Sequence, residues 1–221
     1  MGKLLEIVTP LHTSTTRDYP GRMMDSKIEC MEIAKCYAVD YWDGDRRYGY
    51  GGYKYIPNWW SGVAKKLVEN YNLTNDSKVL DVGCGKAFLL WELRSLLPGL
   101  EIAGFDVSEH GLDCACQEIR HCLHIGRAQE KYRYPDDYFD LVISINCLHN
   151  LNLLELSVAL TELERVGEAG YIVVESYRSN VELFNLQCWA LTADSFLQPS
   201  EWEWLFEKTG YTGDFEFIFF S

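Results

Sequence analysis

The sequence has no long hydrophobic run. Although 48% of its 221 residues are hydrophobic, no apolar stretch approaches the length of about 20 residues that a membrane-spanning helix needs. Residues 1–6 also lack both the apolar core of an export signal and the Ser or Thr of a myristoylation site. These absences predict a soluble globular protein that does not act at a membrane.

Internal repeats and linkers rich in proline, glycine and serine are absent as well. A chain of 221 residues is long enough for one α/β domain with a full core and a modest extension. We therefore expect an N-terminal extension over residues 1–60 and a single ligand-binding domain over residues 61–221.

Basic residues are scarce. The chain has 20 Lys and Arg against 33 Asp and Glu, a formal net charge of −13. Such a charge repels a phosphate backbone at long range. The composition therefore favours a small-molecule substrate over nucleic acid and leaves the oligomeric state open.

The eight cysteines show no regular pairing pattern. This is typical of free thiols in a reducing compartment, so we expect the cytoplasm. A zinc site would have to draw on Cys114, Cys116, His121, Cys122 and His124. Their spacing matches no common zinc signature, so no metal is expected.

Residues 78–87, with the sequence Lys-Val-Leu-Asp-Val-Gly-Cys-Gly-Lys-Ala, are the most informative segment. An apolar strand contains Asp81 near its end, and Gly83 and Gly85 allow a sharp turn close to a ligand before a helical pattern begins. A dinucleotide-binding loop would carry a third glycine where this chain has Phe88. The segment therefore favours another nucleoside-binding corner over a nicotinamide site.

The Asp-x-Gly-x-Gly pattern resembles the first motif of the class I S-adenosylmethionine-dependent methyltransferases, in particular UbiE-like and general methyltransferase-domain members. Ala87 stands where that family usually has glycine, and its methyl group disfavours a left-handed backbone. A second predicted strand, 101–106, ends in Asp106, where a carboxylate is placed to bind both ribose hydroxyls. Asp106 could instead be a helix N-cap.

Further segments fall where the family would place them. Residues 135–146 resemble the fourth strand with its acidic turn, and residues 170–176 resemble the fifth, after a helix over 152–166. The family's adenine-binding Gly-Asp-Ala segment is replaced by residues 126–129, Gly-Arg-Ala-Gln. Since guanidinium is no acceptor, adenine would be held by Gln129, by a backbone carbonyl or by packing.

The resemblance implies an α/β fold with a doubly wound, mostly parallel sheet of six or seven strands and helices on both faces, preceded by a helical and aromatic lid. Near the carboxyl end, a helix is predicted to begin at the N-cap Ser200 and to stop at Gly210. One strand, 215–220, follows it. Either the sheet has six strands, or residues 186–192 supply a seventh.

The resemblance also implies S-adenosyl-L-methionine as cofactor and S-adenosyl-L-homocysteine as product. The residues that it places at the cofactor are Asp81, Val82, Gly83, Cys84, Gly85, Asp106, Val107, Ala128, Gln129 and Asn146.

The acceptor is expected beyond the carboxyl ends of the fourth and fifth strands. His149 is the favoured base, since imidazole titrates near neutral pH, although a histidine after a strand is often only a satisfied helix-start residue. Glu175 falls at the same edge, and Tyr50 is expected to close from the lid. These three residues are the predicted catalytic group.

Residues 40–53 combine tyrosine, tryptophan and glycine, as suits a loop that folds over a bound ligand. Arg46 and Arg47 are placed to meet a carboxylate or phosphate of that ligand. The alternative is a plain packing segment in which both arginines pair with Asp43 and Asp45.

Together these features predict an enzyme that methylates an oxygen or nitrogen atom of a small polar metabolite, such as a sugar or nucleotide-linked intermediate. The N-terminal pattern is similar to that of bacterial methyltransferases. Two alternatives stay open: an idle S-adenosylmethionine-binding protein that acts through partners, suggested by Ala87 and Arg127, and an NAD-dependent oxidoreductase.

Overall fold

The computed structural model describes residues 2–13 and 16–221 of the chain. Its centre is one six-stranded sheet with the strand order β3-β2-β1-β4-β5-β6, in which every neighbouring pair is parallel. The strands are β1 (Lys78–Val82), β2 (Glu101–Asp106), β3 (Leu123–Ile125), β4 (Leu141–Ile145), β5 (Gly170–Glu175) and β6 (Asp214–Ile218). Of the two predicted strand counts, six is the one found.

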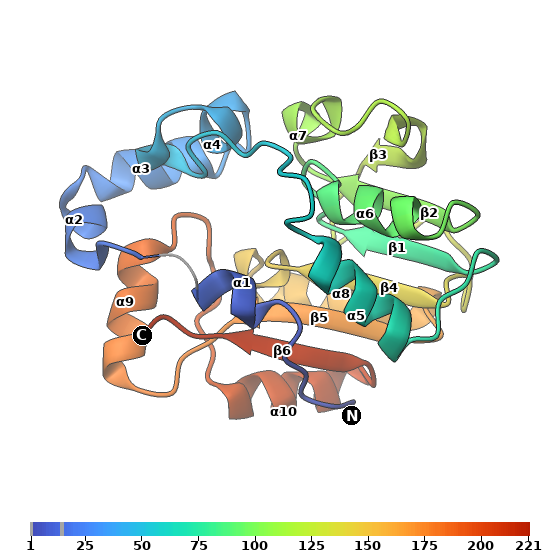
Figure 1. Cartoon of the computed structure of the whole chain (residues 1–221). Coiled ribbons are helices and arrows are strands. Elements are labelled where there is room, and N and C mark those ends of the chain that lie inside the picture. The colour runs from blue at the N-terminus through green and yellow to red at the C-terminus, as the bar shows by residue number, and fades with distance from the viewer. Residues whose placement is uncertain (1, 14–15) are drawn as a thin grey trace.

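Helices cover both faces of the sheet, as predicted (Figure 1). The helices α5 (Ser61–Asn70) and α6 (Phe88–Leu96) pack on one face, and α8 (Leu153–Val166) and α10 (Pro199–Thr209) pack on the other. Because successive side chains of a strand point to opposite faces, Val79 joins the first core and Leu80 joins the second. Strands that are buried on both faces explain the continuous apolar runs in the sequence.

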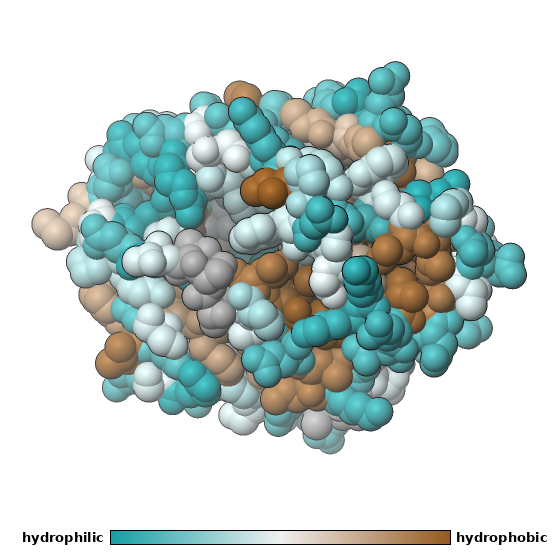
Figure 2. Space-filling view, viewed as in Figure 1, coloured by the Kyte–Doolittle hydropathy of each residue, from teal (hydrophilic) through white to brown (hydrophobic). Residues whose placement is uncertain are grey.

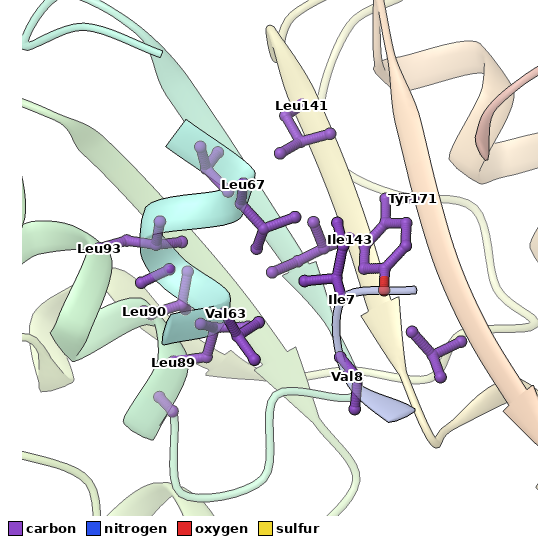
Figure 3. Close-up of a cluster of buried hydrophobic side chains, with 14 of the residues drawn as sticks. Ile7, Val8, Val63, Leu67, Leu89, Leu90, Leu93, Leu141, Ile143 and Tyr171 are labelled. Atoms are coloured by element: carbon purple, nitrogen blue, oxygen red, sulfur yellow. The ribbon is translucent and has the colours of Figure 1, made fainter. Parts of the chain in front are cut away.

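Figure 3 shows the first of these cores. Val63 and Leu67 of α5 and Leu89 of α6 belong to the same buried cluster as Ile143 of β4. The surface seen in Figure 2 is mostly hydrophilic, with exposed hydrophobic residues in separate patches. Within the part of the chain that the structure describes, no helix has the length and apolarity to cross a membrane.

Residues 2–8 pack against the sheet rather than forming part of a lid. Leu4 forms a parallel bridge with Phe215 beside β6. Ile7 and Val8 are buried, and their backbone N–H groups donate to the buried Glu216 carboxylate at 2.6 and 3.0 Å. The predicted extension therefore divides into a core-packed segment, residues 2–8, and a later part.

We call that later part, residues 16–60, the cover. It follows α1 (Thr9–Thr13) and contains α2 (Tyr19–Met24), α3 (Lys27–Ala34), α4 (Val39–Asp43) and the 3-10 turn η1 (Arg46–Tyr48). Figure 1 shows α2 beside α9 (Asn180–Trp189), and the two helices are in contact. Lys27 of α3 adds a second link to α9, since its Nζ donates to the carbonyl of Cys188 at 2.8 Å. The remaining short elements are α7 (Glu109–Asp113), η2 (Arg120–Cys122) and η3 (Leu148–Asn150).

In the carboxyl-terminal third, one of the two alternatives for the sheet and one expected helix cap are wrong. Residues 186–192 form no strand, because most of them lie in α9, whose first turn is capped by the Ser179 hydroxyl accepting from the backbone N–H of Glu182 at 3.2 Å. Ser200 is not the N-cap of α10, since Gln198 occupies that position in a capping box with Glu201. The predicted stop is confirmed, with Gly210 at φ 76°.

Candidate cofactor and acceptor site

Three adjoining cavities lie at the carboxyl edge of the sheet, beneath the cover. We call them the nucleoside cavity, about 380 Å³, the glycine cavity, about 80 Å³, and the arginine cavity, about 350 Å³. Asn146 and Tyr50 line all three. The three cavities lie where the strand order reverses between β1 and β4, the position at which open parallel sheets bind ligands.

The glycine corner after β1 has no room for side chains. Gly83 and Gly85 have φ values of 77° and 54°, which L side chains disfavour. A Cβ at Gly83 would lie 2.3 Å from Sγ of Cys147, and a Cβ at Gly85 would lie 2.7 Å from the ring of Trp42. The backbone of this corner is therefore fixed by its surroundings and stays open toward the glycine cavity, which both glycines line.

Ala87 departs from the expectation for its backbone. It adopts the left-handed conformation, with φ 54°, although its methyl group disfavours it. Its N–H donates to the carbonyl of Cys84 at 2.8 Å, and its carbonyl accepts from Trp91 at 3.0 Å, so the residue both closes the corner and opens α6. These hydrogen bonds, together with burial of the small side chain, outweigh the local preference.

Asp106 supports this corner and faces the nucleoside cavity. Its two carboxylate oxygens accept from the backbone N–H groups of Gly85 and Ser108, each at 2.8 Å. A carboxylate has about four acceptor positions, so acceptor capacity remains for a ribose hydroxyl. The N-cap of α7 is Ser108, whose hydroxyl accepts from Gly111 at 2.9 Å. Of the two predicted roles of Asp106, the cap is thus taken by another residue.

Asp81 lies on the neighbouring strand at the same edge. It pairs in register with Gly104, two residues before Asp106, and it lines the glycine cavity. Burial and the nearby Asp106 raise the pKa of Asp81 to about 8. A cationic group in the glycine cavity would favour its ionised form.

Two thiols flank the same cavities. Cys84 lines the glycine cavity and Cys147 lines the nucleoside cavity. Burial, with the charges of Asp106 and Asp81, raises the pKa of Cys147 to about 12 and that of Cys84 well above its usual range. Both side chains therefore remain thiols at neutral pH.

The far end of the nucleoside cavity is lined by Val107, Arg127 and Gln129. The Gln129 amide nitrogen donates to Glu155 at 3.2 Å, which leaves the amide oxygen as an acceptor. Of the ways predicted to hold an adenine amino group, this one has its acceptor in place. The side chains of Val82 and Ala128 are instead buried in the core beneath the cavities.

Asn146 follows β4 at the junction of the three cavities. Its backbone is left-handed, with φ 55°, and its N–H donates to the carbonyl of Val173 at 3.0 Å. The side-chain Oδ1 is buried and makes no hydrogen bond to any residue that the structure describes. An unpartnered buried acceptor here fits a ligand that carries a hydrogen-bond donor.

His149 and Glu175 come together at the wall of the arginine cavity, as predicted. Nδ1 of His149 accepts from the backbone N–H of Glu175 at 3.4 Å, and Nε2 lies 3.5 Å from the Glu175 carboxylate. Burial lowers the pKa of His149, although Glu175 opposes this. The imidazole is therefore neutral, with its Nε2 proton facing the carboxylate, and it orients Glu175.

The cover contributes stacked aromatic rings to the cavities. Trp42 and Tyr50 are stacked at 5.2 Å with an interplanar angle of 2°. Nε1 of Trp42 donates to Ser108 at 2.7 Å, and Lys86, next to the glycine corner, pairs with Asp43 at 2.7 Å. The aromatic segment thus lies directly against the corner, where the sequence predicted a lid.

The two predicted arginines have different surroundings. Arg46 lines the arginine cavity, whereas Arg47 pairs with Asp25 at 2.7 Å. Asp43 pairs with Lys86 and His110 rather than with an arginine. The alternative in which both arginines pair with Asp43 and Asp45 is therefore wrong.

Arg17, Arg22 and Trp189 also line the arginine cavity, and sequence reasoning missed them. They come from the loop before α2, from α2 and from the end of α9. The signal that could have drawn attention to the first two is the presence of two arginines within six residues of an acidic chain.

The described residues contain one group of three possible metal ligands, Asp43, His110 and Cys114. Asp43 already bonds Lys86 and His110, each at 2.7 Å. Of the cysteines and histidines weighed for zinc, only Cys114 belongs to this group.

The sequence profile described as "Methyltransferase domain" matches residues 73–210. The chain belongs to the methyltransferase-domain family. Its fold is that of the class I S-adenosylmethionine-dependent methyltransferases, as the resemblance of the glycine corner predicted. Its assignment to the UbiE-like branch stays a prediction.

Two curated relatives of the chain are both called mitochondrial arginine-hydroxylase NDUFAF5. The protein of Rattus norvegicus is 28% identical and that of Mus musculus 27% identical, each over 119 residues that make up 53% of this chain and 34% of the relative. The chain thus spans about a third of the length of the curated relatives it matches.

Two solved structures share its fold. A chain of the complex between the Haloferax volcanii Trm112 methyltransferase activator and a methyltransferase has a TM-score of 0.57 at 20% identity, over 89% of this chain and 77% of that one. Geranyl diphosphate C-methyltransferase from Streptomyces coelicolor has a TM-score of 0.54 at 12% identity, over 67% and 59% of the two chains. At these identities the likeness concerns the fold alone.

Proposed function

We propose that this protein transfers a methyl group from S-adenosyl-L-methionine to an oxygen or nitrogen atom of a small polar metabolite. One observation carries the proposal. The cavities that contain Asp106 and the glycine corner meet the cavity that contains Glu175, with Asn146 and Tyr50 shared between them. A donor and an acceptor could therefore lie next to each other without a path through bulk water.

The residues present fit the cofactor. Asp106 keeps acceptor positions for a ribose, the Gln129 oxygen can accept from adenine, and Asp81 suits a cationic amino group. The unpartnered Oδ1 of Asn146 adds a further acceptor. When bound, S-adenosylmethionine supplies a methyl group on a cationic sulfur.

Glu175 is proposed as the base. An acceptor hydroxyl or amine must lose a proton as it is methylated, and the Glu175 carboxylate can take it. The neutral His149, with both ring nitrogens facing Glu175, holds that carboxylate in place. His149 is thus a positioning residue for Glu175 rather than the base itself.

Tyr50 closes the site from the cover. Its ring stacks on Trp42 and lines all three cavities. A flat ring at the junction excludes water from the reacting atoms and limits the acceptor's approach.

A second activity deserves a test because the curated relatives are named as arginine hydroxylases. Three guanidinium groups line the cavity next to Glu175, and they would repel the guanidinium of an arginine substrate. The charge of this cavity therefore favours methyl transfer to another acceptor over hydroxylation of arginine.

Melting curves of the full chain test the cofactor. A ligand that binds the folded state raises the melting temperature at concentrations well above its dissociation constant. We expect stabilisation by S-adenosylhomocysteine and none by NAD, and the reverse result would support an oxidoreductase. Acceptors are then screened for release of S-adenosylhomocysteine. Cofactor binding with no release across phosphorylated and neutral sugars, nucleotides and amines would support the idle binding protein.

A further inference from the structure

Three arginines gather in one cavity of a chain whose net charge is −13. The guanidinium carbons of Arg17, Arg22 and Arg46 lie 5.3, 4.9 and 5.1 Å from the centroid of the Trp189 ring. They reach this ring from three segments of the cover. Like charges gathered around one ring repel one another, so an anionic partner would stabilise the arrangement.

The protein supplies little negative charge there. Glu175 is the one acid among the described residues that line the cavity, and it faces His149. Neither Arg22 nor Arg46 forms an ion pair with any residue that the structure describes. The lining therefore carries three formal positive charges against one negative charge.

Aromatic rings and backbone carbonyls hold the guanidinium groups instead. Arg22 donates to the carbonyl of Arg46 at 2.7 Å, and Arg46 donates to the carbonyl of Gly49. Nε of Arg22 is buried and has no acceptor among the described residues. Burial lowers the pKa of Arg22 and of Arg46, which reflects the cost of keeping these charges away from water. An anion in the cavity would offset that cost.

We infer that the arginine cavity binds a phosphoryl group of the methyl acceptor, so that the substrate is a phosphorylated small molecule. This inference rests on the proposed function and narrows its substrate class. A phosphate monoester carries about −1.5 to −2 charges at neutral pH, which matches the excess of two positive charges. Guanidinium groups bind phosphate oxygens through paired N–H groups in a fixed geometry.

The size and position of the cavity agree with such a substrate. Its volume of about 350 Å³ lies in the range of small-molecule sites. With the phosphoryl group at the arginines, the rest of the molecule would extend past Glu175 toward Tyr50 and Asn146. The phosphate would then be the anchor, and a hydroxyl or amine elsewhere on the molecule would be methylated.

Pyrophosphate is the probe for the anion site. The full chain is melted with increasing pyrophosphate, both with saturating S-adenosylhomocysteine and without it, at constant ionic strength set with sodium chloride. Malonate, a dianion with carboxylates only, is titrated in parallel. We expect pyrophosphate to raise the melting temperature in a saturable way and malonate to act at least about tenfold more weakly.

Arg46 and Arg47 provide a matched pair of variants, since they are adjacent in sequence but only Arg46 lines the cavity. Arg46→Ala should weaken pyrophosphate binding at least about tenfold, whereas Arg47→Ala should change it less than about twofold. Arg22→Lys keeps the charge without the paired geometry and should give an intermediate loss. All three variants should keep the S-adenosylhomocysteine shift of the parent, which also verifies their folding.

Three results would overturn the inference: no saturable effect of pyrophosphate on the parent protein, equal losses in Arg46→Ala and Arg47→Ala, or malonate binding as tightly as pyrophosphate. Each can occur while S-adenosylhomocysteine still binds, and the proposed methyl transfer would then stand. If S-adenosylhomocysteine does not raise the melting temperature, the proposed function is overturned. The pyrophosphate titration without S-adenosylhomocysteine still tests the anion site in that case.

Discussion

Much of the nucleoside side of the site comes from residues 81–106, with Asp81 and Asp106 on neighbouring strands and Gly85 in the turn after β1. The arginine cavity instead draws on Arg17, Arg46 and Trp189, which meet only because the cover packs on α9. The first region is fixed by strand pairing and backbone hydrogen bonds, and the second by contacts between distant segments. Under the proposed function, cofactor binding can therefore be disturbed by local substitutions, whereas acceptor binding depends on how the cover packs against α9.

The strongest test of this difference is Asp106→Ala. The substitution removes the acceptor for the backbone N–H groups of Gly85 and Ser108 as well as the proposed ribose contact. Hydrogen bonds to a charged group contribute about 1.5–3 kcal/mol each, so we expect S-adenosylhomocysteine to bind at least about 100-fold more weakly by calorimetry. His149→Ala should weaken S-adenosylhomocysteine binding less than about threefold. Similar losses in the two variants would contradict the separation of the cofactor side from the acceptor side.

Glu175→Gln tests the acceptor side alone. The amide keeps the shape of the side chain but cannot take a proton, so kcat should fall about 100-fold while the affinity for S-adenosylhomocysteine changes less than about twofold. The rate is measured with an acceptor found in the release screen. Glu207→Gln, on the exposed face of α10, is the control. Unchanged turnover in Glu175→Gln would rule out the proposed base.

A double-mutant cycle of Gly85→Ala and Trp42→Ala probes the contact that joins the two regions. A Cβ at Gly85 would lie 2.7 Å from the Trp42 ring, and the backbone there is left-handed, which alanine disfavours. Gly85→Ala alone should therefore lower the free energy of unfolding by about 2 kcal/mol. Removing the ring relieves the clash but not the backbone strain. The two changes should therefore couple by about 0.5–1 kcal/mol in urea titrations.

The matched control for that cycle is Gly62→Ala in α5, where an added Cβ meets nothing within 4 Å. It should stabilise the helix by about 0.5–1 kcal/mol and show no coupling to Trp42→Ala. Strict additivity of Gly85→Ala and Trp42→Ala would mean that the cover does not press on the glycine corner.

The smallest effect is expected for the pH dependence set by Asp81. Burial and Asp106 raise the pKa of its carboxyl from 3.8 to about 8, so the folded state holds a proton that the unfolded state releases. The stability from this residue is full below about pH 4 and is lost as the pH rises to about 8.

In Asp81→Asn without ligand, we expect the free energy of unfolding to fall less steeply between these pH values, because the amide does not titrate. At pH 7 the variant should be more stable than the parent by about 1 kcal/mol. The gain stays this small because the buried amide must still be desolvated. Asp113→Asn, at an exposed position, is the control. A parallel pH profile for Asp81→Asn and the parent would show that Asp81 is ionised in the folded state.

The same contrast explains what the sequence could predict. The apolar runs of β1, β2, β4 and β5 were found because buried parallel strands leave a continuous pattern. The helix over 152–166 was found because its periodic apolar face is long, and the structure adds a capping box at Asn152. Gly83, Gly85 and Asp106 were predicted because they belong to a local sequence pattern, a glycine turn after one strand and an acid at the end of the next.

Other features left no local pattern. The cluster around Trp189 depends on packing between α2, η1 and α9, which a single sequence does not encode as a motif. The left-handed backbone of Ala87 was missed because its hydrogen bonds to Cys84 and Trp91, together with burial of its side chain, override the residue's preference. The extra strand proposed for 186–192 failed because a short apolar run with tryptophan fits a strand as well as a helix.

The raised pKa values of Cys84 and Cys147 have a chemical consequence for a protein that handles an alkylating agent. Only the thiolate is a strong nucleophile, and burial together with the acidic neighbours suppresses that form for both residues. Under the proposed function, these sulfur atoms can sit beside an activated methyl group without being modified themselves. The carboxylates that would bind the donor thus also protect the enzyme from self-alkylation.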